Sequence, residues 1–475
     1  MKVLLAVLAV GLASLHAKAE SPVSTVTPAM TATAHQLLDL ARQGNQGYEL
    51  VRSLTTEVGP RLAGTEAEAR ARYWAVEKLQ ALGLQNVHVE PFQVPVWLRG
   101  VELAEIVSPF PQSLTIAALG GSSSTGEQGL EAEVVVFNSL SALQQAPRMQ
   151  VEGKIVFIDE VMARSRDGSG YGSAVQKRRE TAYVSQKMGA VAALIRSVGT
   201  SSHRFAHAGQ MRQANTGGDL GVPTAALAAP DADQLTRALG YGKPVTVKLV
   251  ITPQLLPRAV SGNVIGEIVG REAPQEIVLV GAHLDSWDLG TGAVDDGAGI
   301  GVVLGAAKLI IDQLPQGPRR TIRVVLFGAE EVGTVGAKAY ALEHSAELPD
   351  HIIATESDFG AGDIWRFDSR INEQKVLQLA AIAKVLEPLG IASGNNTARG
   401  GPDLKYLREA GVPIVSLLQD GQDYFDFHHT ADDTFDKIAP HALDQNVAAY
   451  AVFLYLVAET TADFRETTQD LTNIN

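Results

Sequence analysis

The sequence predicts an α/β protein built on a mostly parallel, doubly wound β-sheet, with a β-rich module inserted into it. From residue 261 onward, short runs rich in Val, Ile and Leu alternate with helical segments, and these runs are apolar throughout. Strands of that kind are typical of parallel sheets whose two faces are covered by helices. Between residues 101 and 257 the pattern changes to short β runs separated by Gly- and Ser-rich loops, which predicts the inserted module.

The N-terminal segment predicts export. Residues 1–19 combine a positive start, an apolar run from Val3 to Leu15 and an Ala17-Lys18-Ala19 cleavage site, which are the three parts of a secretory signal peptide. The apolar run is shorter than the roughly 20 residues that cross a bilayer, and no later segment is long and apolar enough to span one. Residues 20–33, rich in Ser, Thr, Pro and Ala, are expected to form a linker.

The main domain is expected to comprise residues 34–100 and 258–475. Its first part predicts a helix that Gly83 ends and, after it, a strand in "VHVEPFQVPVW". Its second part predicts strands over 276–283, 321–331, 351–358 and 412–418, which alternate with helices over 297–314, 334–344, 374–390 and 441–460.

The inserted module, residues 101–257, predicts strands in "AEVVVF", "GKIVFID" and "AALIRSV" and one helix over 178–193. No internal repeat of 20–50 residues accompanies this change of pattern.

The composition limits the classes of function. A chain of 475 residues is long enough for one to three domains, and the absence of cysteine excludes a disulfide framework. The net charge is −14 and no run of Lys or Arg is longer than three residues, so nucleic-acid binding is not expected. A cluster of carboxylates in so acidic a chain requires compensation, which a bound cation would supply.

Polar residues lie at the ends of the first three predicted parallel strands and in the loop after the fourth. In chain order they are His283 and Asp285, Glu330 and Glu331, Ser357 and Asp358, and, in that loop, His428 and His429. Each has an ordinary structural explanation when taken alone: a hydrogen-bonded histidine, a helix start or a turn. Together, however, they gather at the edge where ligands bind in such sheets. Carboxylates that face one cleft repel each other, and a metal removes that repulsion. Imidazole and carboxylate ligands without thiols favour zinc, with cobalt or manganese as substitutes.

The stretch "HLDSWDLGTGAVDDGAG" suggests how such a site is built. His283 is a candidate ligand, and Asp285, two residues later on the same side of the strand, is expected to hold its other N–H. Asp295 lies on a glycine-rich loop from which it could reach a point between two ions. Of the adjacent Glu330 and Glu331, one could bind metal while the other acts as a general base.

The combined motifs resemble the co-catalytic di-zinc exopeptidases of the aminopeptidase type, and within them the branch of the plasma glutamate carboxypeptidases, also called carboxypeptidase Q. They are H-x-D, DDGAG, GAEE-x-G, a strand that ends in SD, and HHT followed by DDT, and the likeness covers nearly the whole mature chain. The resemblance implies two Zn²⁺ ions per chain, with His283 and Asp358 on one, Glu331 and His429 on the other, and Asp295 bridging both.

The same resemblance implies Glu330 as the general base and Asp285 as the support of His283. It also implies a cis peptide bond between Asp295 and Asp296, a protease-associated-like inserted domain, dipeptides or short peptides as substrates, and a homodimer.

Several alternatives remain open at this stage. His428 competes with His429 as a ligand, and the roles of His203 and His207 are undetermined. Rival functions are a glutaminyl cyclase-like acyltransferase and a non-catalytic zinc-bearing binding protein. The side-chain preference, the choice between aminopeptidase and strict dipeptidase, the physiological metal, and periplasmic or extracellular location do not follow from the sequence.

Overall fold

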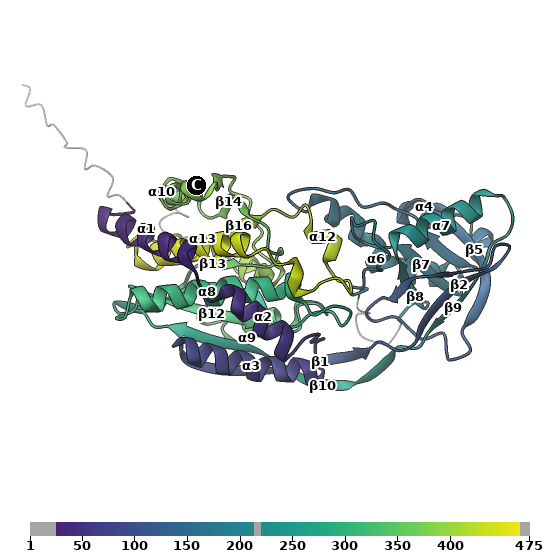
Figure 1. Cartoon of the computed structure of the whole chain (residues 1–475), viewed down its shortest axis with the longest axis horizontal. Coiled ribbons are helices and arrows are strands. Elements are labelled where there is room, and N and C mark those ends of the chain that lie inside the picture. The colour runs from purple at the N-terminus through teal and green to yellow at the C-terminus, as the bar shows by residue number, and fades with distance from the viewer. Residues whose placement is uncertain (1–24, 213–219, 466–475) are drawn as a thin grey trace, which may run out of the picture.

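The computed structural model describes residues 25–212 and 220–465, which form two lobes, each built around an eight-stranded sheet (Figure 1). The larger lobe contains the N- and C-terminal parts of the chain, and the smaller lobe contains the strands between residues 102 and 251. The signal peptide and the start of the linker that we predicted lie outside the described residues. No helix within the described ranges is long and apolar enough to cross a membrane.

The sheet of the larger lobe is parallel at its centre and mixed at its edges. Its strand order is β1-β10-β12-β11-β13-β16-β14-β15, and the pairs β12–β11, β11–β13 and β13–β16 are parallel. The bounds of these four central strands are Arg320–Phe327 (β12), Ala273–His283 (β11), His351–Glu356 (β13) and Ile414–Gln419 (β16). The predicted mostly parallel sheet is therefore confirmed at the centre and corrected at the edges.

The flanking strands account for the correction. β1 (Gln85–Leu98) and β10 (Gln254–Ile268) form a long antiparallel ribbon, and β14 (Ile364–Arg370) runs antiparallel to β16, with β15 (Ala392–Ser393) beyond it. Residues 90–96 of β1 alternate between exposed and more buried positions, as in an antiparallel pair with one face in water. The ribbon runs along the lower edge of the molecule and joins the two lobes (Figure 1).

Helices cover both faces of this sheet, as the apolar strands require. One face packs against α8 (Ala298–Gln313), α13 (Pro440–Glu459), α2 (Gly47–Glu57), α3 (Glu66–Leu82) and α10 (Val376–Val385). The other face packs against α9 (Val335–Glu343) and α11 (Lys405–Glu409). Alternate residues of β11 divide between the two faces: Val278 and Val280 join the first core and Ile277 and Leu279 the second.

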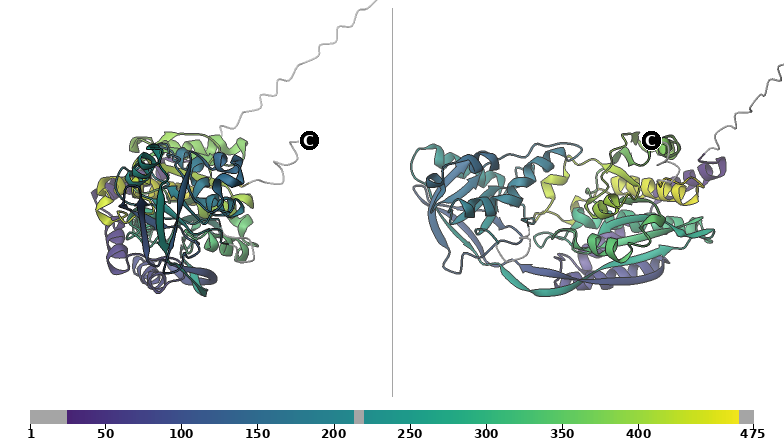
Figure 2. Two further views of the ribbon diagram at one scale, coloured as in Figure 1. Left: turned by 90° about the vertical axis from the view of Figure 1, so that its right-hand side faces the viewer. Right: turned by 180° about the vertical axis from the view of Figure 1, so that it is seen from behind.

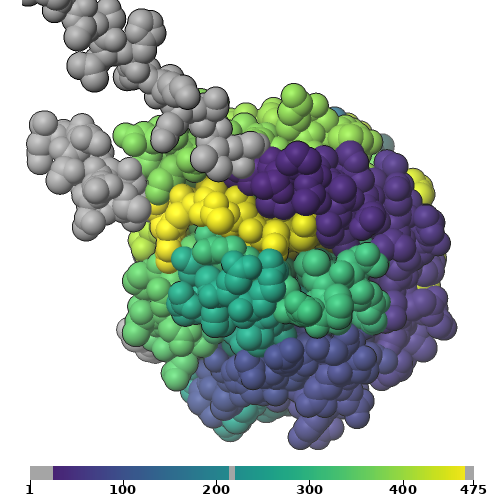
Figure 3. Space-filling model, turned by 90° about the vertical axis from the view of Figure 1, so that its left-hand side faces the viewer, coloured from purple at the N-terminus to yellow at the C-terminus, as the bar shows by residue number. Residues whose placement is uncertain are grey.

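The predicted linker is shorter than expected, because α1 (Pro28–Gln43) begins inside it. The Thr27 side chain accepts a hydrogen bond from the Met30 amide and Pro28 occupies the first helical turn, an arrangement that favours helix initiation. Ala34 and Leu37 of this helix are buried in the main core. Figure 3 shows the purple α1 beside the yellow C-terminal segment, where it contacts α13.

The smaller lobe is an α/β unit, with more helix than the β-rich module with one helix that we predicted. Its strand order is β3-β2-β9-β5-β6-β7-β8-β4. The strands are Glu102–Ser108 (β2), Gln112–Leu114 (β3), Ile116–Ala118 (β4), Leu130–Phe137 (β5), Ile155–Ile158 (β6), Ala192–Arg196 (β7), Thr224–Leu227 (β8) and Thr246–Ile251 (β9). Its helices are Leu140–Gln145 (α4), Arg148–Val151 (α5), Ser169–Lys187 (α6) and Ala229–Gly240 (α7).

Helix α6 lies at the end of the smaller lobe that faces the larger lobe. The short helix α12 (Tyr424–Phe427) lies at the facing end of the larger lobe (Figures 1 and 2). Contacts between residues 200 and 425 and between residues 208 and 429 join the two lobes at this point.

Candidate metal centre

The polar residues predicted at the strand ends converge on one site. His283 is the last residue of β11, and Glu330 and Glu331 follow β12 after a short turn. Asp358 lies two residues beyond β13, while His428 and His429 follow α12 in the loop after β16. The carboxyl ends of parallel strands meet at one edge of a sheet, so segments far apart in the sequence place these side chains together.

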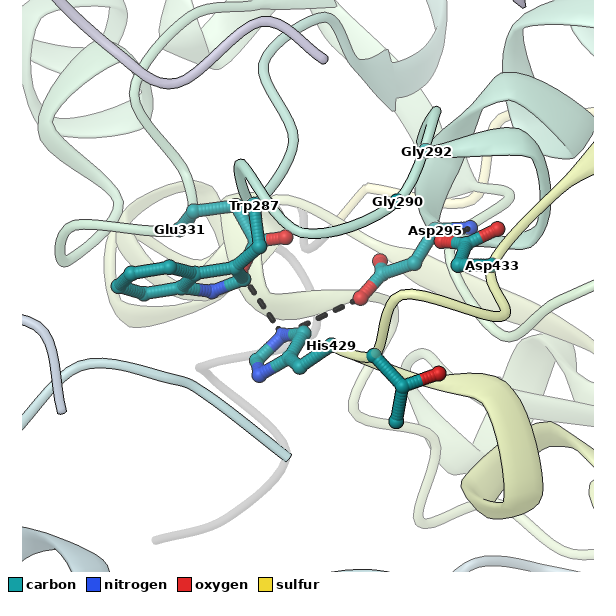
Figure 4. A pocket seen from close by; sticks show the side chains of 8 residues that line it. Trp287, Gly290, Gly292, Asp295, Glu331, His429 and Asp433 are labelled. Carbon is teal, nitrogen blue, oxygen red and sulfur yellow. Dashed lines mark hydrogen bonds and ion pairs between the residues drawn. The ribbon is translucent and has the colours of Figure 1, made fainter. Parts of the chain in front are cut away.

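Two groups of three side chains share Asp295. On one side, His283 Nε2 lies 3.1 Å from Asp295 Oδ1 and 3.5 Å from Asp358 Oδ1. On the other side, His429 Nε2 lies 3.2 Å from Asp295 Oδ2 and 2.9 Å from Glu331 Oε2. Figure 4 shows the His429 ring between Asp295 and Glu331. One carboxylate thus presents its two oxygens to two separate histidine nitrogens.

The loop that carries Asp295 is fixed by its neighbours. Asp433 accepts hydrogen bonds from the amides of Val294 and Asp295, at 2.6 and 3.2 Å. Asp296 accepts from the His283 and Gly299 amides, both at 3.0 Å, and the peptide bond between Asp295 and Asp296 is cis, as the family resemblance implied. A Cβ at Gly299 would lie 2.1 Å from the Ser357 carbonyl oxygen, so the close approach of α8 to the site requires glycine.

Arg61 holds the preceding part of the same loop from inside the protein. Its fully buried guanidinium donates to the carbonyl oxygens of Leu284 (2.6 Å), Thr291 (2.8 Å) and Gly292 (2.9 Å). Gly292, at φ +60°, adopts the left-handed conformation that glycine tolerates. Arg61 lies in the stretch "EVGPRLAGT", from which we predicted no site residue, and its role emerges from the tertiary structure.

Asp285 makes contacts that differ from those expected. The Nδ1 of His283 lies 2.9 Å from the Asp285 main-chain oxygen, whereas the nearest carboxylate oxygen is 3.8 Å away. The carboxylate instead accepts from the amides of Glu330 (3.0 Å) and Glu331 (3.3 Å). Because the His283 ring contacts the main-chain oxygen of Asp285, the Asp285 carboxylate is available to position the main chain of the two glutamates.

The electrostatics of the site favour a bound cation. Burial raises the pKa of Glu330 well above its usual range, and burial also raises the pKa values of Glu331 and Asp358. Burial opposes ionisation of Asp295 too, but the neighbouring His283 and His429 hold its pKa well below the usual range. Glu331 Oε1 is buried without a hydrogen-bond partner. Buried carboxylates with unused oxygens, gathered around two imidazole nitrogens, fit the donor set of a divalent metal.

His429 is better placed than His428 to complete this arrangement. His428 Nε2 is 3.7 Å from Asp295 Oδ2, farther than His429 Nε2, although distance alone groups both histidines with Asp295. The two rings stack with centroids 3.4 Å apart, and only His429 also contacts Glu331. His428 instead packs against the rings of Tyr171, Tyr424 and Phe425.

The smaller lobe contributes directly to the site. The Ala208 amide donates to the His429 carbonyl at 2.9 Å, and His207 Nδ1 donates to the His428 carbonyl at 2.8 Å. Burial lowers the pKa of His207 to about 4, so its ring is neutral near pH 7. His207 therefore holds the ligand-bearing loop, whereas His203 is exposed and lies 4.0 Å from Asp432.

A small pocket opens at the Asp295 and His429 side of the site. Trp287, Gly290 and Thr430 line it together with Glu331 and Asp433 (Figure 4). The Trp287 ring lies 5.6 Å from the His429 ring, centroid to centroid, and contacts Trp97 on its other side. Trp287, in the loop after β11, therefore supplies an aromatic wall of the pocket, and Trp97 of β1 packs against it.

Histidines and carboxylates at the carboxyl edge of a parallel sheet, with a further glutamate beside them, define a metal-dependent hydrolase. A profile of peptidase family M28 matches residues 263–454. The chain is 36% identical over 415 residues to bovine (Bos taurus) carboxypeptidase Q, a match that covers 87% of this chain and 86% of that protein. The chain therefore belongs to peptidase family M28.

Solved structures agree with this assignment. The structure of a peptidase M28 precursor from Shewanella amazonensis SB2B superposes with a TM-score of 0.89 at 50% identity and covers 92% of this chain and 98% of that one. BSAP, a zinc aminopeptidase from Bacillus subtilis, shares the fold with a TM-score of 0.65 at 23% identity, over 89% of this chain and 98% of that one. The family resemblance and the peptidase class predicted from the sequence are confirmed.

Proposed function

We propose that this chain is an exported metallo-exopeptidase that hydrolyses dipeptides or short peptides with a free N-terminus, using two zinc ions. The arrangement of the two three-residue groups that share Asp295 supports this proposal above all, because one carboxylate between two histidines matches a pair of adjacent cations. Carboxypeptidase Q among the relatives supports the exopeptidase class.

The distances support the ligand assignment that the family resemblance implies. His283 and Asp358 would hold one ion, Glu331 and His429 the other, and Asp295 would bridge them. When bound, such ions act as Lewis acids that polarise a carbonyl oxygen and favour the ionisation of water.

Glu330 is the proposed general base. Its amide donates to Asp285, and its partly buried carboxyl group interacts electrostatically with His283, Asp358 and Glu331. Burial raises its pKa, which makes it a stronger proton acceptor than an exposed glutamate. Glu330 would take a proton from the water that adds to the scissile carbonyl, and would pass this proton to the departing amine as the C–N bond breaks.

One experiment separates this proposal from its rivals. Purified protein, with metal content measured, is incubated with a panel of dipeptides and with a peptide that begins with Gln. Free amino acids, produced only by metal-loaded protein, support the peptidase. Ammonia release with cyclisation of the Gln peptide would indicate the acyltransferase, and zinc binding without turnover of any substrate would indicate a binding protein.

Export is part of the proposal and rests on residues 1–19. N-terminal sequencing of protein secreted or released from the periplasm tests it, with cleavage after Ala19 as the expected result. A homodimer and a protease-associated-like role for the smaller lobe are proposed on the family resemblance, and sedimentation analysis tests the dimer.

A further inference from the structure

Two histidines and a glutamate that take no part in the proposed metal centre meet on the α9 side of the larger lobe. His88 and Glu90 are two residues apart on β1, so their side chains share one face of the strand. His344 directly follows α9, which contacts β1. His88 Nε2 lies 3.3 Å from Glu90 Oε1, and His344 Nε2 lies 2.8 Å from the same oxygen. One carboxylate oxygen thus faces two imidazole nitrogens.

The other nitrogen of each ring is held by an oxygen atom. His88 Nδ1 lies 2.6 Å from the Asn86 main-chain oxygen, and His344 Nδ1 lies 3.1 Å from Glu347 Oε2. Arg323 Nη1 also approaches His344 Nδ1, at 3.4 Å, but it lies closer to Glu347, at 3.1 Å. Histidines that bind metals are oriented in the same way, with the second nitrogen against a carbonyl or carboxylate oxygen. Both Nε2 atoms are therefore presented as metal ligands are.

Glu90 has an unused oxygen at the same place. Its Oε2 atom is buried and has no hydrogen-bond partner, while its Oε1 meets both histidines. A buried carboxylate oxygen without a donor costs free energy, which a bound cation would offset. A cavity of about 380 Å³ lies beside it, lined by His88 and Glu90 from β1 and by Ala339 and Glu343 from α9. This cavity has room for the waters that would complete the coordination of an ion.

The charges around the cluster also favour a cation. Arg323 is already paired with two glutamates, at 2.8 and 3.1 Å. Within the described residues, neither Glu90 nor Glu343 forms an ion pair with a lysine or an arginine. Burial lowers the pKa of His344, but hydrogen bonds with Glu90 and Glu347 outweigh burial and raise it overall. Surroundings that favour a proton on this ring favour a metal cation beside it as well.

We propose that His88, Glu90 and His344 bind a divalent transition-metal ion such as Zn²⁺ at a second site, separate from the proposed catalytic centre. Zinc takes imidazole nitrogen and carboxylate oxygen at about 2.0–2.2 Å, so ligand atoms around one tetrahedral ion are about 3.3 Å apart. The two contacts with Glu90, at 2.8 and 3.3 Å, have about this spacing. The three ligand atoms are less tightly grouped than those around Asp295, and the half-exposed His88 ring can turn inward to close the group.

An ion at this position would join the β1–β10 ribbon to the body of the larger lobe. β1 is the edge strand of its sheet, and the ribbon continues to the smaller lobe (Figure 1). A metal shared between β1 and the residue after α9 would therefore stabilise the connection between the lobes. The inference does not depend on the proposed peptidase activity, because none of the three ligands belongs to the catalytic centre.

The test is a calorimetric titration with Zn²⁺ of protein without a polyhistidine tag, whose catalytic centre is already loaded. The wild type is expected to bind one further ion per chain. His88→Gln and Glu90→Gln each remove a ligand and are expected to weaken this binding by at least about tenfold. Glu347→Gln changes the oxygen behind His344 and is expected to weaken it by a smaller factor. His35→Gln, which removes an exposed histidine of α1, is the matched control and is expected to keep the wild-type affinity.

Two further measurements keep the inference testable if a variant folds poorly. Crystals of the wild type in excess Zn²⁺, measured on both sides of the zinc absorption edge, are expected to show an anomalous peak between His88, Glu90 and His344. Excess Zn²⁺ is also expected to raise the melting temperature of the loaded wild type more than that of the His88→Gln protein, because an ion that binds only the folded state stabilises it.

Three outcomes would overturn the inference. The first is the absence of an anomalous peak at this position in saturating Zn²⁺, and the second is equal Zn²⁺ binding by the wild type and by the His88→Gln and Glu90→Gln proteins. The third is a loss of binding in His35→Gln as large as in His88→Gln, which would show that the extra zinc binds surface histidines without a defined site.

Discussion

Replacing Arg61 by Met tests whether one buried side chain organises the metal-binding loop. The side chain has no exposed surface and donates to the carbonyl oxygens of Leu284, Thr291 and Gly292 at 2.6–2.9 Å, and to that of Gly59 at 3.3 Å. Methionine fills similar space but leaves these oxygens without their donor, and each unsatisfied group costs about 1–3 kcal/mol.

The gross cost over four carbonyl groups is therefore about 4–12 kcal/mol. Part of this cost is offset because the variant no longer buries a charge, and burial already lowers the pKa of Arg61. We expect a net loss of about 3–5 kcal/mol, the range found when one partner of a buried charged network is removed. The same change should weaken zinc binding, because the loop connects His283 to Asp295.

Urea denaturation of the metal-free protein, followed by tryptophan fluorescence, measures the first effect, and zinc titration measures the second. Arg52→Met is the matched control, since Arg52 is exposed and pairs with the equally exposed Glu49; its replacement is expected to leave stability close to that of wild type. An Arg61→Met protein within 1 kcal/mol of the control, with unchanged zinc affinity, would refute the reasoning.

Three further predictions concern the site and the core. Glu330→Gln should lose most peptidase activity while it binds the full complement of zinc; turnover within tenfold of wild type would defeat the base assignment. His429→Ala should lose bound zinc, whereas His428→Ala should retain it, and full occupancy in the His429→Ala protein would reverse the choice. Burial lowers the pKa of His351 to about 4, from a value near 6.5 in the unfolded chain. Between these two pH values His351 is protonated in the unfolded chain but neutral in the folded chain. Stability should therefore decline from pH 6.5 towards pH 4, with up to about 1.4 kcal/mol per pH unit from this residue, and His351→Gln should flatten that slope in urea titrations.

The proposed ligands could be predicted because parallel strands impose a simple rule. Each lies at or just beyond the carboxyl end of a central strand or in the loop that follows, so the order of strands and helices alone placed them together. We expected the Asp285 side chain to bind His283, but His283 meets the Asp285 main chain instead. Sequence spacing does not determine which way an imidazole ring turns. The Nδ1 of His283 meets the main chain, which leaves the Asp285 carboxylate to the glutamate amides.

Contacts between residues far apart in the sequence could not be predicted from the local sequence pattern. Arg61 binds a loop more than 220 residues later, and Arg178 meets a histidine 251 residues away. Such contacts depend on how the lobes and layers pack. Helix α6 begins nine residues before its predicted start at residue 178. Gly170 and Gly172 lower the local helix propensity, so the sequence did not predict this first part, but the rest of the helix overrides their effect.

The hydrogen bond between the Ala208 amide and the His429 carbonyl has a practical consequence for anyone who wishes to shorten this protein. A version trimmed to the larger lobe would keep every proposed ligand and the base in its sequence, yet it would lose the support of residue 429, a non-glycine residue at φ +62°. We therefore expect trimming to weaken the binding of any cation at His429, so that the proposed catalysis would require both lobes.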